Sequence, residues 1–277
     1  MSALLPLNWQ RVSSSEDNSV LLILCISAGE LNHLPALFTC HLIDEANGPI
    51  PMQLQRVCHD TLPWLISVSL GHTKTKLLSM PDKAVYLLVV DGFADWEAAH
   101  AVAELRRHGG YRVESVGLTR DSVVSMGGLR ITPSRTVGEI EPNDVAVFIL
   151  PGGDRWETMP MELELASALK RLDAEKVPIA AICAATVAIA RLGLLRGRQH
   201  TSNGLKYLQS HVPEYREAQN YVEAPAVRDR GLITASGIAD VEFARELFEE
   251  LGVLSPNDRA VWADIFRNAR LPDETRA

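Results

Sequence analysis

Two short, uninterrupted apolar runs constrain the fold of this chain more than any other feature of its sequence. Residues 84–90 (AVYLLVV) and 145–150 (VAVFIL) each have the length of one strand and contain no charged side chain. Apolar residues at every position indicate a strand that is covered on both faces, as strands of parallel sheets are. Residues 179–182 (IAAI) form a shorter run of the same kind.

Segments with helical spacing of their apolar residues lie between these runs, so the chain alternates between strand and helix over about 190 residues. This alternation predicts an α/β fold, a three-layer sandwich around a mostly parallel sheet. The expected strands cover residues 84–90, 111–117, 145–150, 179–182, 221–228 and 232–234, with a hairpin over 123–131. The expected helices cover residues 96–108, 162–175, 184–192, 241–251 and 256–269.

The first 80 residues have a different composition. They contain 4 basic and 6 acidic residues, against 23 and 29 in residues 81–277, and they hold three of the four cysteines. We expect residues 1–80 to be an N-terminal extension without a stable fold of its own, and residues 81–277 to form the main domain. Because Met80 directly precedes the first strand of that domain, we hypothesise that the functional protein starts at or near Met80. The alternative is a small accessory domain.

Composition excludes several classes of function. A net charge of −8 argues against a nucleic-acid-binding protein, which needs a basic face. The apolar run over residues 20–26 is far shorter than the about 20 residues of a membrane helix. A secretory signal is also not indicated, and four cysteines are too few for a disulfide scaffold, so the cytoplasm is the expected compartment. Neither Cys40–His41 nor Cys58–His59 has the spacing of a zinc site, so we expect no metal.

Cys183 is the cysteine of the main domain, and it falls between a predicted strand and a predicted helix. Small neighbours permit a tight turn that displays a nucleophile. The helix N-terminus should stabilise the thiolate and lower the thiol pKa. Ligands of parallel sheets bind beyond the carboxyl ends of the strands, where residues 91–97 and 151–154 also lie. The alternative, a buried inert cysteine, has about equal weight on spacing alone.

Four segments, in order along the chain, carry a resemblance to a known family. They are residues 91–97 (DGFADWE), 145–153 (VAVFILPGG), 178–185 (PIAAICAA) and 232–246, which begin LITASG and end EFARE. They resemble the ThiJ/PfpI family of the class I glutamine amidotransferase-like superfamily, which includes the Parkinsonism-associated protein described as a deglycase. The resemblance covers about residues 83–252 and implies a flavodoxin-like sheet order. It has no counterpart for residues 1–80.

The resemblance also implies roles for individual residues. Cys183 would be the nucleophile or an oxidation-sensitive thiol, and Glu97 would hydrogen-bond its sulfur. The backbone N–H groups of Gly153 and Ala184 would stabilise an oxyanion. Simpler interpretations remain open, since Glu97 could complement a helix dipole and residues 152–153 could form a plain turn.

This chain departs from the family pattern next to the cysteine. Protease-like members have His directly after it, whereas this chain has Ala184, which argues against a Cys-His peptidase dyad. His200 lies in the region where other members supply a histidine, so it is our candidate for proton transfer. Ser202 could occupy that place instead, and a solvated loop histidine is an equally weighted alternative.

The resemblance therefore predicts a cysteine-dependent hydrolase or a glyoxalase- or deglycase-like enzyme that acts on small carbonyl or acyl substrates. It needs no cofactor, and a homodimer is expected from the family. The alternative is a non-enzymatic oxidative-stress sensor or chaperone that uses Cys183. A glutamine amidotransferase-like subunit is a weaker alternative because it would need a late His-x-Glu pair, and no histidine follows His211.

Overall fold

The chain divides into two units, Met1–Ser79 and Met80–Ala277. The computed structural model describes residues 81–271 and, in the first unit, only the backbone of six strands. Those strands form a two-stranded and a four-stranded antiparallel sheet. They are β1 (Asn8–Ser13), β2 (Val20–Cys25), β3 (Leu37–Asp44), β4 (Gly48–Val57), β5 (Leu65–Leu70) and β6 (Thr73–Lys74). That this unit lacks a stable fold of its own stays a prediction, and the cysteine and histidine side chains of residues 25–59 lie outside the described part.

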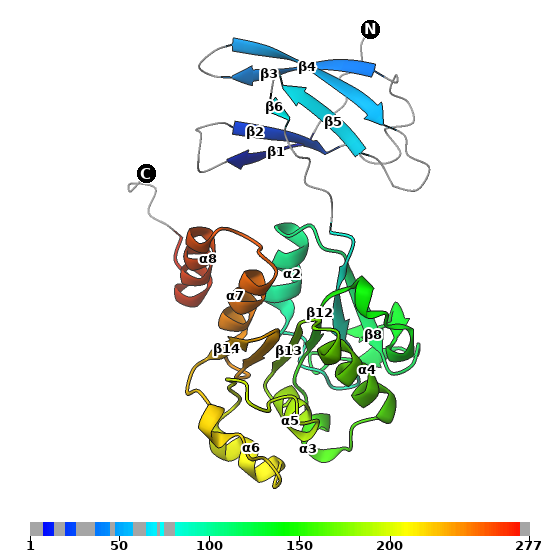
Figure 1. The fold of residues 1–277 in the computed structure, drawn as a ribbon, viewed down its shortest axis with the longest axis vertical. Helices are drawn as coiled ribbons and strands as arrows, with labels where there is room; N and C mark the ends of the chain where they lie inside the picture. The colour runs from blue at the N-terminus through cyan, green and yellow to red at the C-terminus, as the bar shows by residue number, and fades with distance from the viewer. Residues whose placement is uncertain are drawn as a thin grey trace. The chain divides into compact units, whose positions relative to one another are not determined.

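A seven-stranded sheet forms the centre of the second unit (Figure 1). Its strand order is β11-β8-β7-β12-β13-β15-β14, and every neighbouring pair is parallel except β14 with β15. The strands are β7 (Ala84–Leu88), β8 (Val113–Gly117), β11 (Arg135–Thr136), β12 (Val145–Leu150), β13 (Ile179–Ile182), β14 (Ala226–Asp229) and β15 (Leu232–Ala235). The predicted mostly parallel sheet is confirmed.

Helices cover both faces of this sheet, which completes the three-layer sandwich (Figure 1). One face packs against α2 (Ala99–Arg107), α7 (Asp240–Glu250) and α8 (Pro256–Asn268). The other packs against α3 (Arg155–Thr158), α4 (Leu163–Ala174), α5 (Ala185–Arg191) and α6 (Leu205–His211). Within the described residues, no helix has the length and apolar character needed to cross a membrane.

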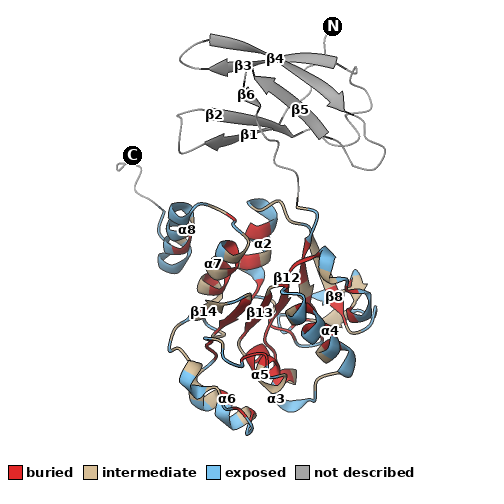
Figure 2. Ribbon diagram, viewed as in Figure 1, coloured by how far each residue is buried: buried red, intermediate tan, exposed pale blue. Residues whose placement is uncertain are grey.

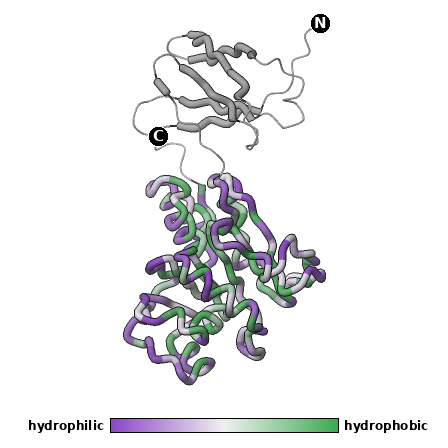
Figure 3. Tube along the Cα trace, turned by 45° about the vertical axis from the view of Figure 1, so that its right-hand side comes forward, coloured by the Kyte–Doolittle hydropathy of each residue, from purple (hydrophilic) through white to green (hydrophobic). Residues whose placement is uncertain are grey.

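Burial follows the apolar runs of the sequence. All six residues of β12 and all four of β13 are buried, and Figure 2 shows the buried residues along the strands and on the helix faces that meet them. The hydropathy of the trace has the same distribution, with apolar segments inside and polar segments outside (Figure 3). The central strands are thus covered on both faces, as their composition predicts.

The structure differs from the sequence prediction between residues 200 and 230. The strand expected over residues 221–228 is limited to β14, after a 3-10 turn at Ala218–Asn220. Pro225 directly precedes β14 and has no N–H for a sheet ladder, which explains the later start of the strand. Helix α6, in contrast, was not expected. The hairpin predicted over residues 123–131 is confirmed as β9 (Val123–Val124) and β10 (Arg130–Ile131).

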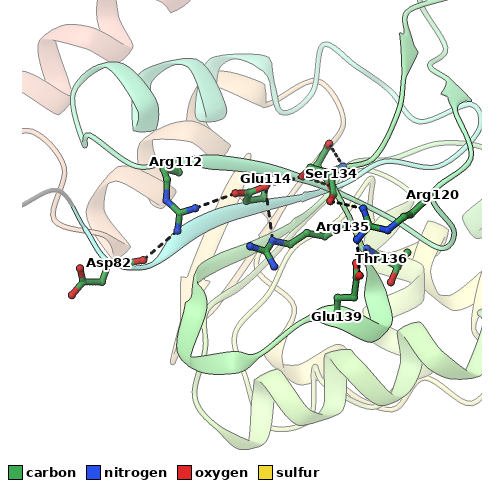
Figure 4. Close-up of polar contacts among 9 residues, drawn as sticks. Asp82, Arg112, Glu114, Arg120, Ser134, Arg135, Thr136 and Glu139 are labelled. Carbon is green, nitrogen blue, oxygen red and sulfur yellow. Dashed lines mark hydrogen bonds and ion pairs between the residues drawn. The ribbon is translucent and has the colours of Figure 1, made fainter. Parts of the chain in front are cut away.

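A polar network lies at the edge of the sheet formed by β8 and β11 (Figure 4). Glu114 of β8 accepts hydrogen bonds from Arg112 at 3.1 Å and from the Ser134 hydroxyl at 2.7 Å. Arg120 donates to Glu139 at 2.6 Å, and the backbone N–H of Thr136 donates to the same carboxylate. These contacts hold the short strand β11 in place, far along the strand order from β13.

Candidate active site

Three of the loops singled out from the sequence meet at the carboxyl ends of β7, β12 and β13. The backbone N–H of Gly152, after β12, donates a 2.6 Å hydrogen bond to Glu97 Oε2. The N–H of Ala94 donates to the Gly152 carbonyl at 3.0 Å. The Glu97 carboxyl also lies beside Cys183, the residue that follows β13. The structure therefore brings Cys183, Glu97 and the diglycine turn together.

Cys183 has a strained backbone. Its φ is +59°, in the left-handed region that residues other than glycine, asparagine and aspartate rarely adopt. The geometry is held by a 2.9 Å hydrogen bond from the Cys183 N–H to the Ala235 carbonyl and by the start of α5 directly afterwards. Strand β13, this residue and α5 together form the sharp strand-to-helix turn that the sequence predicts, with the sulfur displayed at its corner.

Two glycines leave the room that the thiol occupies. A Cβ atom at Gly237 would lie 2.6 Å from Cys183 Sγ, and one at Gly152 would lie 2.7 Å from both Cys183 Cβ and Glu97 Oε2. Real Cβ atoms do not approach other heavy atoms this closely, so a side chain at either position would displace the cysteine or the carboxyl. The site thus depends on glycine from two separate loops.

The sulfur has three polar neighbours. Asn203 Nδ2 donates a hydrogen bond to Cys183 Sγ over 3.3 Å. The backbone N–H of Ala184 and the carboxyl of Glu97 are the other two hydrogen-bonding groups. Asn203 comes from the loop that precedes α6, Ala184 lies at the start of α5, and Glu97 comes from the loop before α2. Three separate segments therefore meet at the sulfur.

Burial shifts the titration of both central groups. The pKa of Glu97 is raised to about 7, mainly because the side chain is 1% exposed, and the Gly152 and Cys183 hydrogen bonds oppose that shift. Burial likewise raises the pKa of the Cys183 thiol to about 11, against the lowering effect of Asn203. The sequence-based expectation of a lowered thiol pKa is therefore wrong. Removal of the sulfur from water, together with the neighbouring carboxylate, outweighs the dipole of a seven-residue helix.

His200 lies away from the sulfur contacts and is fully buried. Its Nδ1 is 2.7 Å from the Arg198 carbonyl and its Nε2 is 2.6 Å from the Tyr215 hydroxyl. A carbonyl only accepts, so Nδ1 carries the proton and Nε2 accepts from Tyr215. Burial lowers the pKa of the imidazole, which is thus a neutral, fully bonded group. It is not the solvated loop histidine of the alternative, and its role in proton transfer stays a prediction.

Ser202 contacts the strand-to-helix turn at Cys183 indirectly, through Thr186. Its hydroxyl is 2.6 Å from that of Thr186, which donates to the Cys183 carbonyl over 2.6 Å. The serine thus reaches the backbone of the strand-to-helix turn through Thr186. The two backbone N–H groups that are predicted to stabilise an oxyanion belong to Ala184 and Gly153. The Ala184 N–H is close to the sulfur, whereas Gly153 adopts φ +148° and lies beside the Gly92 carbonyl. Their joint role stays a prediction.

Comparison with known proteins identifies the family. The family model described as "DJ-1/PfpI family" matches residues 83–250. The chain belongs to the DJ-1/PfpI family. The uncharacterized protease YoaZ of Bacillus subtilis is 37% identical over 194 residues, which cover 66% of this chain and 90% of that protein. A deglycase of Thermococcus kodakarensis is 25% identical over 118 residues, or 43% of this chain and 70% of that protein.

Solved structures of DJ-1/PfpI proteins have the same fold. The DJ-1 superfamily protein Atu0886 from Agrobacterium tumefaciens is 32% identical, with a TM-score of 0.62, and the match covers 68% of this chain and all of that one. A thiJ/pfpI family protein from Bacillus anthracis is 34% identical, with a TM-score of 0.61, and the match covers 70% of this chain and 94% of that one.

In this DJ-1/PfpI chain a shallow cavity of about 260 Å³ is lined in part by Asn203, the residue whose amide contacts the sulfur. Hydroxyl groups, one amide and one carboxylate line it, and the lining residues are Thr201, Ser202, Asn203, Gly204, Tyr221, Glu223, Ala224, Pro225 and Ser236. Within the described residues, no group of three or more His, Cys, Asp and Glu side chains is arranged to hold a metal ion. Asn203 is the residue that this cavity and the cysteine site share.

Asn203 is the site residue that sequence reasoning missed. The sequence favours His200 as the polar candidate of this region, because imidazoles transfer protons. An available signal was its position, since Asn203 lies just before a glycine that begins an unpredicted helix. Its contact with the sulfur depends on how that loop folds back over β15, which spacing along the chain does not reveal.

Proposed function

We propose that this protein is a cysteine-dependent enzyme that acts on small carbonyl or acyl substrates, with Cys183 as nucleophile and Glu97 as general base. The observation that carries the proposal is the strained Cys183 with its sulfur next to a buried carboxyl. Strained backbone of this kind costs about 1–3 kcal/mol and persists where the surroundings hold it, often at active sites.

The two raised pKa values suggest how the thiol is activated. A thiol pKa of about 11 leaves little thiolate at neutral pH, so attack needs a base. Glu97, with a pKa of about 7, is a stronger base than an ordinary carboxylate and is matched to neutral pH. In the first step the Sγ–C bond forms, the thiol proton passes to Glu97, and the electron pair of the C=O π bond moves to the oxygen.

The oxyanion formed in this step would be stabilised by the backbone N–H groups of Ala184 and Gly153. From there the substrate determines the outcome. With an aldehyde, Glu97 returns its proton to the oxygen and a hemithioacetal results. With an acyl compound, the leaving group takes that proton as the C=O bond re-forms, and water then hydrolyses the thioester. Both routes need only the chain's own residues and water.

The names of the relatives support this class of chemistry. Some are described as deglycases and others as uncharacterized proteases. In this chain Ala184 follows the cysteine, so no imidazole comes from that position, and a peptidase stays the less favoured form of the proposal. A cytoplasmic location and a homodimer also stay proposals.

A redox sensor or chaperone is the competing function for Cys183. Peroxide reacts with the thiolate, and a raised thiol pKa keeps that form scarce. The same shift is compatible with an enzyme that removes the proton only when substrate is present. The titration of this site therefore favours the enzyme.

Turnover measurements would separate the two functions. We would assay the purified full chain with methylglyoxal and with a panel of activated esters and amides, and compare it with Cys183→Ala and Cys183→Ser. Turnover by the wild type that falls by a factor on the order of 10³ or more in both variants would support the enzyme. If the wild type shows no Cys183-dependent turnover while mild peroxide converts Cys183 to sulfinic acid, the enzyme proposal is rejected in favour of the sensor.

A further inference from the structure

We propose that Asn203 is a catalytic residue of this site. Its side-chain amide, in place of an imidazole, stabilises the Cys183 thiolate by donating a hydrogen bond to the sulfur. This inference rests on the proposed function. It concerns how the charge left on the sulfur is stabilised once the proton has moved to Glu97. Its basis is the hydrogen bond from Asn203 Nδ2 to Sγ.

A second contact fixes the orientation of that amide. The backbone N–H of Gly237 donates to Asn203 Oδ1 over 2.9 Å. The opposite orientation would place two donors against each other at Gly237 and would point the amide oxygen at the sulfur. The amide therefore presents its NH₂ group to Sγ. Gly237 is also the residue whose missing Cβ leaves room for the sulfur, so a single loop residue positions both the donor and the nucleophile.

An amide can do only part of what an imidazole does. It donates hydrogen bonds to a developing negative charge, but it does not take up a proton near neutral pH. Proton acceptance and charge stabilisation thus lie on two residues from different loops, Glu97 and Asn203. Hydrogen bonds to the charged form of a group favour that form, and Asn203 lowers the thiol pKa against the effect of burial.

Asn203 also lines the neighbouring cavity. Its side chain is exposed, and Ser202 and Gly204 line the same cavity. Asn203 therefore contacts the sulfur and is also accessible from the cavity.

Other titratable groups around the sulfur must be considered in any pH experiment. Glu97 lies beside the thiol, in the loop before α2, and the negative charge of Asp240 in α7 contributes to raising the Glu97 pKa. Cys183 and Asn203 are among the groups that shift the pKa of Tyr207 in α6. The Tyr207 hydroxyl donates a hydrogen bond to Glu157 over 2.6 Å. Burial and this carboxylate raise the pKa of Tyr207, so it stays neutral. Variants of Asn203 leave these groups in place.

The test is the rate at which iodoacetamide alkylates Cys183 as a function of pH, without substrate. Asn203→Asp retains an oxygen for the Gly237 N–H but places a carboxylate against the sulfur. We expect its alkylation rate at a given pH to fall by about tenfold or more. Asn203→Ala removes the donor without adding charge and should give a smaller fall. Asn257→Asp makes the same substitution on an exposed residue of α8 and should leave the rate unchanged.

Equal rate profiles for the wild type, Asn203→Asp and Asn203→Ala would overturn the inference. Thermal unfolding checks that each variant is folded, and Asn203→Ala carries the test alone if Asn203→Asp is not. The alkylation assay needs no turnover, so its result stands even if the proposed enzymatic function fails. Conversely, Cys183-dependent turnover with unchanged alkylation profiles would retain the enzyme and reject the role of Asn203.

Discussion

Two polar clusters in the second unit invite comparison. The first is the cysteine site, with Cys183, Glu97 and Asn203. The second is the histidine cluster, in which His200 lies between Tyr215 and Tyr221. Burial shifts the pKa of groups in both. Within the described residues, however, the histidine has both ring nitrogens bonded inside the protein, whereas the cysteine is strained and partly exposed.

This difference in bonding and exposure distinguishes the two residues better than their pKa shifts do. A shifted pKa follows from burial alone and is found in structural networks as well as in active sites. Backbone strain and two glycines that make room for one sulfur are found at the cysteine site and not at His200, Tyr215 or Tyr221. The comparison predicts that substitutions at the cysteine site affect chemistry, and that substitutions at the histidine cluster affect stability.

The largest effect is expected from Gly237→Ala. The new methyl group would be 2.6 Å from Cys183 Sγ and 2.9 Å from Cys183 Cβ, so the sulfur must move. Because a displacement of about 1 Å at a reacting atom can cost on the order of 10²-fold in rate, we expect at least that loss in turnover. Thiol alkylation should fall as well. Both rates are measured against the wild type at equal concentrations of folded protein.

Gly138→Ala is the matched control for this prediction. Its Cβ would approach Glu164 Oε1 to 2.4 Å, but that atom ends a flexible surface side chain that can turn away. We expect little change in either rate. Equal losses in the two glycine variants would mean that the Gly237 effect is not specific to the sulfur, and the comparison between the clusters would lose its strongest support.

Glu97→Gln tests the general base and should have the next largest effect. Glutamine keeps an oxygen for the Gly152 N–H but cannot accept the thiol proton. We expect turnover to fall by about 10²-fold, the lower end of the range for loss of a general base. In the wild type, Glu97 is a base only when it is ionised, so turnover should rise with pH through about 7, its pKa. The pH–rate profile of the variant should lack this inflection.

Glu104→Gln makes the same substitution at a second buried glutamate. Glu104 of α2 pairs with His108 over 3.0 Å and is not among the groups that shift the pKa of the Cys183 thiol. Its variant should keep both the turnover and the inflection near pH 7. A Glu97→Gln profile that retains the inflection would assign it to another group and remove Glu97 from the role of base.

The sequence predicts the fold and the centre of the site because these depend on local patterns. Apolar runs mark β7, β12 and β13, and residues at the ends of such strands must meet at one edge of the sheet, which places Cys183 near Glu97. Gly237 and Asn203 are not predictable in this way, since their contacts with the sulfur depend on loops that fold across the sheet. The predicted direction of the thiol pKa shift was wrong, because the sequence reveals where a helix starts but not how deeply the thiol is buried.

The smallest effect on chemistry is expected at the histidine cluster. His200→Phe keeps a buried ring but leaves the Arg198 carbonyl and the Tyr215 hydroxyl without their partner, and unpaired buried polar groups cost about 1–3 kcal/mol each. We therefore expect a clear loss in the free energy of unfolding, measured with urea, and turnover per folded molecule within a few-fold of the wild type. Tyr215→Phe removes one of the two bonds and should cost less. Since the histidine and tyrosine share a bond, the double variant should lose less than the sum of the single losses. A hundredfold loss of turnover in stably folded His200→Phe would instead place this imidazole in the reaction, and the distinction between a structural and a reactive cluster would fail.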